Sequence, residues 1–501
     1  MRMHELARPC GNSPTLTRVT TVSGPQPYPS TAPSQDIGNP ALVSALSCVG
    51  LSPRDLVRAI NDRVVAVGHR RLDVTAGYNW CRGAVPRSPL VRHVAAAVLS
   101  DVSNTGYTVE NLWGQAQAGA ADPLQSQWAT DDLVGPRDLP DVLNSAASWT
   151  SGSTNVATMR AATPDQLSAA VWDAMRQQDR RVLGSGGDHA ERVDPPLMTV
   201  HEEHLKSLRR LDDKTGGGPL SQRQVRIALF DVITLLRTSS YTPDIRIRLL
   251  RTAAGLAQLG GWMAFDGSLA AAAQRYQLLA LRLAQAAGDH DTVANVLGML
   301  AYQHSAHARP AEALRFATSA VEYSSHGLPL VRARALGRLA TAHASAGDID
   351  SFRRAADQCR HLIAQRTPDD PAALYYFTDD QLAAESGHAL VELASSNPRF
   401  TRKLLAEAAD LLSPMVSEGT DGEYKRSAVL HGIHLARARL LAKDTDATAH
   451  ILTSLAGQLP GVQSMRCRDL LINVRRSAGR PLRSAHRTDA IEAVDQALSA
   501  A

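Results

Sequence analysis

The sequence predicts an all-α protein in which a small helical domain precedes a long array of helix pairs. Only 4% of the 501 residues are aromatic, and the alanine- and leucine-rich chain has few β-branched runs, which favours helices. From about residue 199 onward, apolar residues recur at helical spacing almost without interruption. A chain of this length can hold two to four domains.

Composition also indicates the compartment. The cysteines Cys10, Cys48, Cys81, Cys359 and Cys467 are scattered without a Cys-x-x-Cys pair, so we expect neither a disulfide framework nor a cysteine zinc site, and a cytoplasmic location. No apolar run approaches the length of about 18 residues that a membrane span needs. Residues 1–40 are rich in Pro, Ser, Thr and Gly and lack a signal-peptide core, so we expect them to be disordered.

Residues 41–114 contain the helix-starting and helix-ending residues expected of a compact helical domain. Ser52-Pro53-Arg54-Asp55 places a capping Ser, a Pro and an acid at the start of a helix, and Gly68 is expected to end it. Ser88-Pro89 starts a later helix, and Val74–Arg82 forms about two helical turns between them. Short helices with a turn before the middle one predict a helix-turn-helix.

This domain is basic while the rest of the chain is nearly neutral. Between Leu51 and Arg92 there are 8 Arg and 3 Asp, a net charge of +5, whereas the whole chain is +4. A basic helical unit at one end of a neutral helical array is typical of a DNA-binding domain attached to a sensor.

The motif Trp80-x-Arg82-Gly83-x-x-Pro86-Arg87, followed by a helix and then Tyr107-Thr108 and Leu112-Trp113, resembles the XRE-type helix-turn-helix of actinobacterial regulators. The resemblance implies that Val74–Arg82 holds the recognition helix. Independently of the resemblance, we expect Trp80 to pack in the core of the domain rather than to touch DNA. The resemblance assigns base or phosphate contacts to Thr75, Tyr78, Asn79 and Arg82, and backbone phosphate contacts to Arg70, Arg71 and Arg87.

Two features depart from the pattern. The helix expected before the recognition helix is barely visible in Gly68–Asp73, and Gly77 lies inside the recognition helix, where it costs about 0.5–1 kcal/mol relative to Ala. A degenerate helix-turn-helix that contacts proteins is therefore the alternative.

The remaining chain divides by composition. Residues 115–162 lack a sustained period and are expected to be a linker. Thr163-Pro164-Asp165-Gln166 is a capping signature for a helix to about Arg181, and residues 163–198 form a helical connector. Residues 199–480 form the array, and residues 481–501 a terminal helix or tail.

The sequence of the array predicts stacked helix pairs. Helix ends are expected at Gly260-Gly261, at Gly288-Asp289 and at Ala346-Gly347-Asp348. Leu297-Gly298 and Leu336-Gly337 lie 39 residues apart. The tetratricopeptide period is about 34 residues, so the longer spacing implies lengthened helices or a looser helical-hairpin repeat. Five or six pairs would form a tetratricopeptide-like α-solenoid.

The stretches around Leu211-Asp212-Asp213, Leu256–Asp266 and Ala280–Asp289 resemble the sensor region of the same actinobacterial helix-turn-helix/tetratricopeptide regulators, which control differentiation and specialised metabolism. The groove of such a solenoid suits a peptide or protein ligand. The candidate groove residues are Trp262, Asp266, Tyr276, Asn295, Tyr302 and Gln303. Each of these residues also has a structural interpretation. For example, Trp262 would pack helix pairs together, Asp266 would cap the next helix, and Tyr276 would lie in the core.

Nothing in the sequence indicates an enzyme, a metal site or a cofactor. His201 and His204 are three apart on one helix, which offers two zinc ligands at most, and His304/His307 and His431/His434 repeat this weak spacing. Gly216-Gly217-Gly218 lacks the strand and the Lys of a phosphate loop, and no catalytic triad signature is present.

The sequence therefore predicts a cytoplasmic transcription regulator that binds double-stranded DNA through its N-terminal helix-turn-helix. Its helical-repeat region is expected to dimerise and to sense a peptide, a protein or a small molecule. The resemblance implies a repressor of development or antibiotic production. We expect a homodimer, because one small head makes few contacts and two half-sites lie one turn, roughly 34 Å, apart. The alternative is an interaction scaffold that does not bind DNA.

Overall fold

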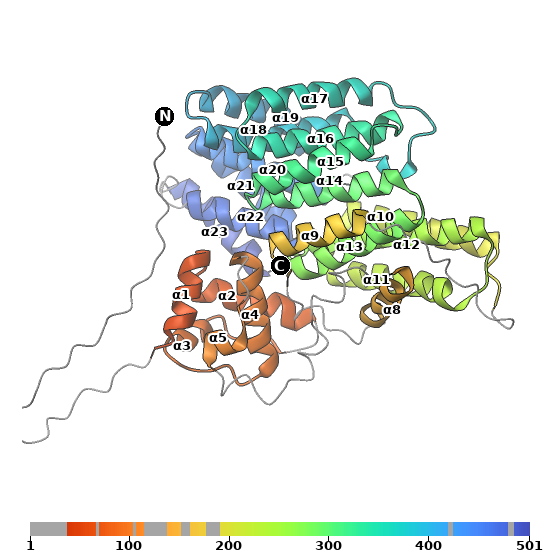
Figure 1. Cartoon of the computed structure of the whole chain (residues 1–501). Coiled ribbons are helices and arrows are strands. Elements are labelled where there is room, and N and C mark those ends of the chain that lie inside the picture. The colour runs from red at the N-terminus through yellow and green to blue at the C-terminus, as the bar shows by residue number, and fades with distance from the viewer. Residues whose placement is uncertain are drawn as a thin grey trace, which may run out of the picture.

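The computed structural model describes residues 38–66, 70–103, 107–114, 138–151, 161–176, 191–418, 424–478 and 485–500. In these ranges the chain is all-α, as the sequence predicts, and its one extended pairing is an isolated bridge between Arg192 and Ser240. Figure 1 shows a small cluster of helices beside α22 and α23 of a much larger helical body. None of the described helices is long and apolar enough to cross a membrane.

The N-terminal cluster, called the head here, comprises α1 (Pro40–Val49), α2 (Pro53–Ala66), α3 (Ala76–Cys81), α4 (Pro89–Ser103) and α5 (Val109–Trp113). The capping residues act as expected, because the Ser52 hydroxyl donates to Asp55 at 2.6 Å and accepts from the Asp55 backbone N–H at 3.2 Å. Trp80 packs in the head's core with Leu56 and Val94. The start of α4 at Pro89 also agrees with the sequence.

Three details of the head differ from the expectations. Helix α1 begins at Pro40, inside the segment expected to be disordered, of which residues 1–37 lie outside the described chain. Residues 70–75, in the segment expected to hold a faint helix, are not helical, so α2 is the helix that precedes α3. The expected end of α2 at Gly68 lies outside the described residues.

The segment expected to be a linker contains a helix that belongs to the main core. Helix α8 (Leu139–Thr150) begins at the Asp138 cap and buries Leu139, Leu143 and Trp149 against α11 and α13. The helices that follow are α9 (Pro164–Arg176), α10 (Pro195–Thr215) and α11 (Pro219–Thr238). Helix α9 starts where its capping signature predicts, and residues 177–181 of its expected length lie outside the described residues.

The helical array continues as pairs in which the two helices of each pair contact each other. The pairs are α12 (Pro243–Asp266) with α13 (Ala270–Ala286), α14 (His290–Ala306) with α15 (Pro310–Tyr323), α16 (Pro329–Ser345) with α17 (Ile349–Ile363), α18 (Asp379–Ser396) with α19 (Thr401–Glu418), and α20 (Lys425–Leu441) with α21 (Thr445–Gln458). The array ends with α22 (Met465–Ala478) and α23 (Ala485–Ala500), and two short 3-10 helices, η3 (Ala372–Leu374) and η4 (Leu459–Gly461), lie in its connections.

Gly260-Gly261 does not end a helix, contrary to the sequence prediction. Both glycines lie inside α12, where a Cβ would come within 2.8 Å of Tyr276 or 2.5 Å of Gln277 on α13. The missing side chains allow α12 and α13 to approach closely, so here glycine serves packing between helices.

The first helices of successive pairs form an inner layer that closes on itself. α12 contacts α14, α14 contacts α16, and the sequence continues through α18 and α20 to α22. Helix α22 in turn contacts α12, and α10 contacts α20. A backbone hydrogen bond from Gln463 N–H to the Thr215 carbonyl, 2.9 Å, joins the two ends of the array. The inner helices therefore surround a common axis.

Candidate functional site

The residues assigned to DNA all lie exposed on one helix of the head and on the turns beside it. Thr75, Tyr78, Asn79 and Arg82 belong to α3 or its ends, and Tyr78 is 41% exposed. Arg70, Arg71 and Arg87 are exposed on the flanking turns. The Thr75 hydroxyl donates to Asp73 at 2.7 Å, which orders the turn before α3. Trp80, on the opposite side of α3, is buried.

Gly77 explains how α3 is held in place. A Cβ at this position would lie 2.2 Å from the carbonyl oxygen of Pro53, so α3 packs directly on the first turn of α2. Glycine is required here by a close approach between two helices.

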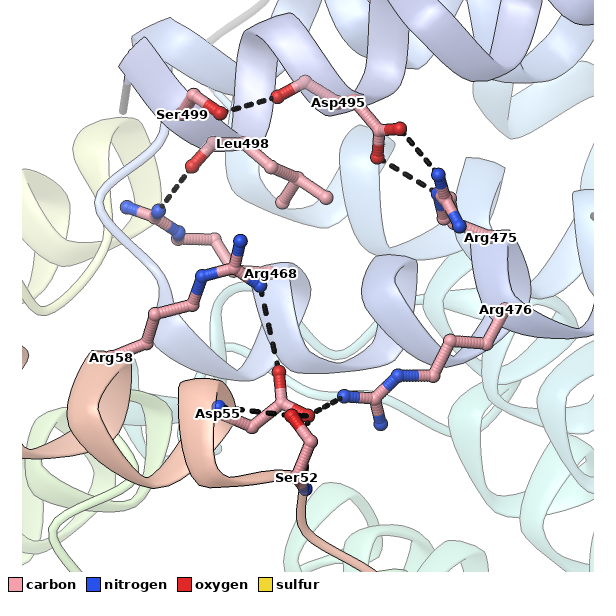
Figure 2. A network of polar contacts seen from close by, with 9 residues as sticks. All are labelled: Ser52, Asp55, Arg58, Arg468, Arg475, Arg476, Asp495, Leu498 and Ser499. Atoms are coloured by element: carbon pink, nitrogen blue, oxygen red, sulfur yellow. Dashed lines mark hydrogen bonds and ion pairs between the residues drawn. The ribbon is translucent and has the colours of Figure 1, made fainter. Parts of the chain in front are cut away.

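The head contacts the array through α2 (Figure 2). Arg476 on α22 donates to Asp55 at 2.5 Å, and Asp55 also binds Ser52 and Arg58. Nearby, the Arg63 guanidinium donates to the Ser268 carbonyl at 3.4 Å. Burial in this interface raises the pKa of Asp62, against the attraction of Arg468.

The six predicted groove residues occupy three different places. Trp262, Asp266 and Tyr302 gather around two arginines on the axis of the array. Asn295 lines a pocket beside that axis. Tyr276 is core, edge-on to Trp149 with ring centroids 4.8 Å apart, and Gln303 is buried. The capping role considered for Asp266 is absent, because the N-cap of α13 is Leu269.

Charged side chains from α10 and the inner helices, each at most 11% exposed, meet on the axis. We call them the central charge cluster, which comprises Asp212 of α10, Asp266 of α12, Arg334 and Arg338 of α16, Glu385 of α18, Arg426 of α20 and Arg466 of α22.

Asp266 contacts both arginines in one half of the central charge cluster. It is 0% exposed and accepts from Arg466 at 3.2 Å, while Arg426 lies 3.9 Å away. Arg426 also pairs with Asp212 at 3.2 Å. Burial raises the pKa of Asp212 to about 6, although Arg426 opposes this shift. A buried carboxylate or guanidinium that lost its partner would carry the full desolvation cost.

Glu385 organises the other half. Arg334 donates to both of its carboxylate oxygens, at 2.9 and 3.1 Å. Burial alone would raise the pKa of Glu385, but Arg334 and then Arg338 lower it to about 2. Arg338 lies 3.8 Å from Glu385, too far for a hydrogen bond, and stacks 4.3 Å above the Tyr302 ring.

Three histidines extend the cluster between α18 and α20. His388 stacks on His434 with ring centroids 3.9 Å apart, and a ring nitrogen of His431 lies 3.1 Å from one of His388. Burial lowers the pKa of His431 to about 4 and that of His434 to about 3. No group of three side chains arranged to hold a metal ion occurs in the described part of the chain.

A pocket of about 550 Å³, open to solvent on one side, borders the central charge cluster. Its polar lining comes from α10, α12, α14 and α16 and consists of Arg209, Gln258, Asp291, Thr292, Asn295, Arg334 and Arg338. Its apolar lining includes Val331, Ala335 and Leu374.

Sequence reasoning missed the arginines that dominate this region. Arg334 and Arg338 lie four residues apart within the Ala- and Gly-rich stretch of α16. A cation at helical spacing on an otherwise apolar face could have indicated a buried ionic site. The carboxylate partners could not have been found, because Glu385 and Asp212 come from distant helices.

Comparison with known protein families finds no matching family model, and comparison with curated proteins finds no significant match.

Proposed function

We propose that this chain is a DNA-binding transcription regulator, in which the head binds duplex DNA and the helical array senses a signal and joins two copies. The observation that carries this proposal is the exposure of all seven residues that the sequence motif assigns to DNA. The head is attached to the array through α2, at Asp55 and Arg63, which leaves these residues uncovered.

The charge distribution around α3 suits a duplex. Arg70 and Arg71 precede α3, and Arg82 and Arg87 follow it, so cations flank the helix on both sides. Phosphate contacts from such cations position a reading helix, and side chains between them reach base edges. Helix α3 is six residues long, about 9 Å, so two heads on half-sites roughly 34 Å apart are required for tight binding.

A continuous set of contacts connects the array to α3. Arg466, at the start of α22, belongs to the central charge cluster, and Arg476, about 15 Å further along the same helix, binds Asp55. Asp55 lies in the first turn of α2, on which Gly77 of α3 packs. A shift of α22 would therefore move α3, which is the coupling that a regulator needs.

The salt dependence of DNA binding tests the proposal. The affinity of the full chain for a pool of duplex fragments should fall steeply with salt, with a logarithmic slope of about −0.9 per phosphate contact. The double variant R82A/R87A should lose detectable binding at physiological salt, whereas R399A/R402A, which removes two arginines exposed elsewhere, should bind like the wild type. Equal binding by R82A/R87A would refute the assignment of α3.

The alternative is an interaction scaffold in which the head docks onto another protein. Residues 70–75, which precede α3, are not helical, and these six residues alone make a longer connection than the roughly three or four residues of most helix-turn-helix units. The scaffold predicts no salt-dependent DNA binding by the wild type, so the same titration distinguishes the two functions.

A further inference from the structure

The pocket beside the central charge cluster has an excess of positive charge. Three guanidinium groups line it, from Arg209, Arg334 and Arg338, against one carboxylate, that of Asp291. Arg334 is neutralised by its two hydrogen bonds with Glu385. The other two arginines have no such partner.

Arg338 is buried and poorly satisfied. Its side chain is 6% exposed, its Nε has no hydrogen-bond partner in the described part of the chain, and Glu385 lies 3.8 Å away. Burial, and then the neighbouring Arg334, lower the pKa of Arg338. A buried guanidinium without hydrogen bonds is costly unless something else supplies the acceptor.

Arg209 is the second cation of the pocket without an ionic partner among the described residues. It forms no ion pair or hydrogen bond with the described residues, and Asp213, the carboxylate whose charge acts on it, accepts a hydrogen bond from the hydroxyl of Tyr375. Burial lowers the pKa of Arg209 as well. It projects beside Gly255, where a Cβ would lie 3.1 Å from its Nη2, so the glycine leaves room for the guanidinium at the pocket wall.

We infer that this pocket binds the oxyanion group of a small organic molecule, a carboxylate or a phosphate ester, with Arg209 and Arg338 as its counter-charges. Guanidinium groups suit both anions because their donors match paired oxygen acceptors. The amides of Gln258 and Asn295 offer further polar contacts.

The remaining lining indicates the body of the ligand. Val331, Ala335 and Leu374 give the pocket an apolar wall, and small-molecule sites combine such walls with a few placed polar groups. An extended peptide fits less well, because the inner helices close around the axis and the central charge cluster occupies it. The ligand should therefore be an anion on a compact apolar frame.

The ligand would act close to the route that leads to the head. Arg338 stacks on Tyr302, and the Tyr302 hydroxyl accepts a hydrogen bond from Arg466 of α22 at 2.7 Å. Neutralising Arg338 would change the balance of charge around Arg466. This regulatory role rests on the proposed function, whereas binding of the anion does not.

Calorimetric titration of the full chain with benzoate and phenyl phosphate tests the inference, with benzamide as the neutral comparison. At least one anion should bind and benzamide should not. The anion with the lower dissociation constant shows whether the pocket prefers a carboxylate or a phosphate ester. Arg338→Gln and Arg209→Gln should each raise the dissociation constant about tenfold or more, the effect of losing a charge-assisted hydrogen bond. Arg332→Gln, on the exposed face of the same α16, should leave it unchanged.

Arg209→Gln guards against a folding artefact, because Arg209 has no ionic partner within the described residues to leave behind. Equal binding of benzamide and the anions, equal affinities for wild type and Arg209→Gln, or no binding of either anion at millimolar concentration would overturn the inference. If the anions bind while the chain shows no affinity for DNA, the pocket stands and the proposed function fails.

Discussion

Gly77 allows α3 to pack directly on the first turn of α2. As a glycine inside a helix it should weaken α3, and Ala should be the better residue by about 1 kcal/mol. In the structure it is buried, and a Cβ would meet the Pro53 carbonyl at 2.2 Å. The steric effect is larger, because backbone atoms on both sides must move.

We therefore predict that Gly77→Ala destabilises the head by about 1–3 kcal/mol, the usual cost of overpacking. Gly457→Ala is the matched control, because no atom lies within 4 Å of its Cβ position on α21, and it should be neutral or slightly stabilising. Chemical denaturation followed by circular dichroism would measure both. A stabilised Gly77→Ala variant would show that α3 does not pack on α2.

The buried histidines give the fold a dependence on pH. His434 has an ordinary pKa of 6.5 when unfolded, and burial and then Arg437 lower it to about 3 in the fold. Between pH 6.5 and about 3, His434 therefore binds a proton in the unfolded chain but not in the folded chain. The stabilisation is complete above pH 6.5 and is lost as the pH falls toward 3, by about 1.4 kcal/mol per pH unit.

Comparison with His434→Gln isolates this effect. Asp212 and Asp469, whose pKa values burial raises to about 6, contribute the opposite dependence on pH in the wild type. The difference in unfolding free energy between wild type and His434→Gln should shrink as the pH falls from 7.5 to about 5, as urea denaturation would show. A difference that stays constant would mean that His434 is not buried as a neutral ring.

At the scale of elements, α22 is the helix that connects the axis of the array to the head. Its first turn places Arg466 in the central charge cluster, and its last turn places Arg475 and Arg476 at the interface with α23 and α2. Figure 2 shows the contact of Arg476 with Asp55 and that of Arg475 with Asp495. Exposed ion pairs of this kind contribute only up to about 1 kcal/mol each, so the attachment of the head should be adjustable.

We predict that the charge-reversal variant R468E/R476E releases the head without unfolding the array. Repulsion from Asp55 and Asp62 replaces attraction in the interface. Small-angle X-ray scattering should show a larger radius of gyration than for the wild type. The control R399E/R402E makes the same change of charge at exposed positions elsewhere; equal radii for both variants would mean that other contacts hold the head.

The sequence predicts a helix well when the interactions that stabilise the helix are local in the chain. Capping residues identified the starts of α2, α4 and α9, because those interactions are local. The linker composition around α8 concealed a helix, since its stability comes from burial of Leu143 and Trp149 against α11 and α13. Gly260-Gly261 resembled a helix end because the Tyr276 and Gln277 that fill the space lie on another helix.

At the scale of the whole molecule, closure of the inner layer decides what kind of site the array offers. An open solenoid presents a groove, as the sequence predicts, and Trp262, Asp266 and Tyr302 would line it. Contact of α12 with α22 and of α10 with α20 instead places these three residues around Arg466. Such closure depends on contacts between segments about 200 residues apart, which no local pattern records.

Sequence-specific binding of DNA by the head should be visible in a genome-wide DNA pull-down with the tagged protein. We expect discrete enriched sites that share a two-fold symmetric motif with half-sites about one helical turn apart, and we expect R82A/R87A to lose them. No enrichment above background, or enrichment that R82A/R87A retains, would contradict sequence-specific binding by the head.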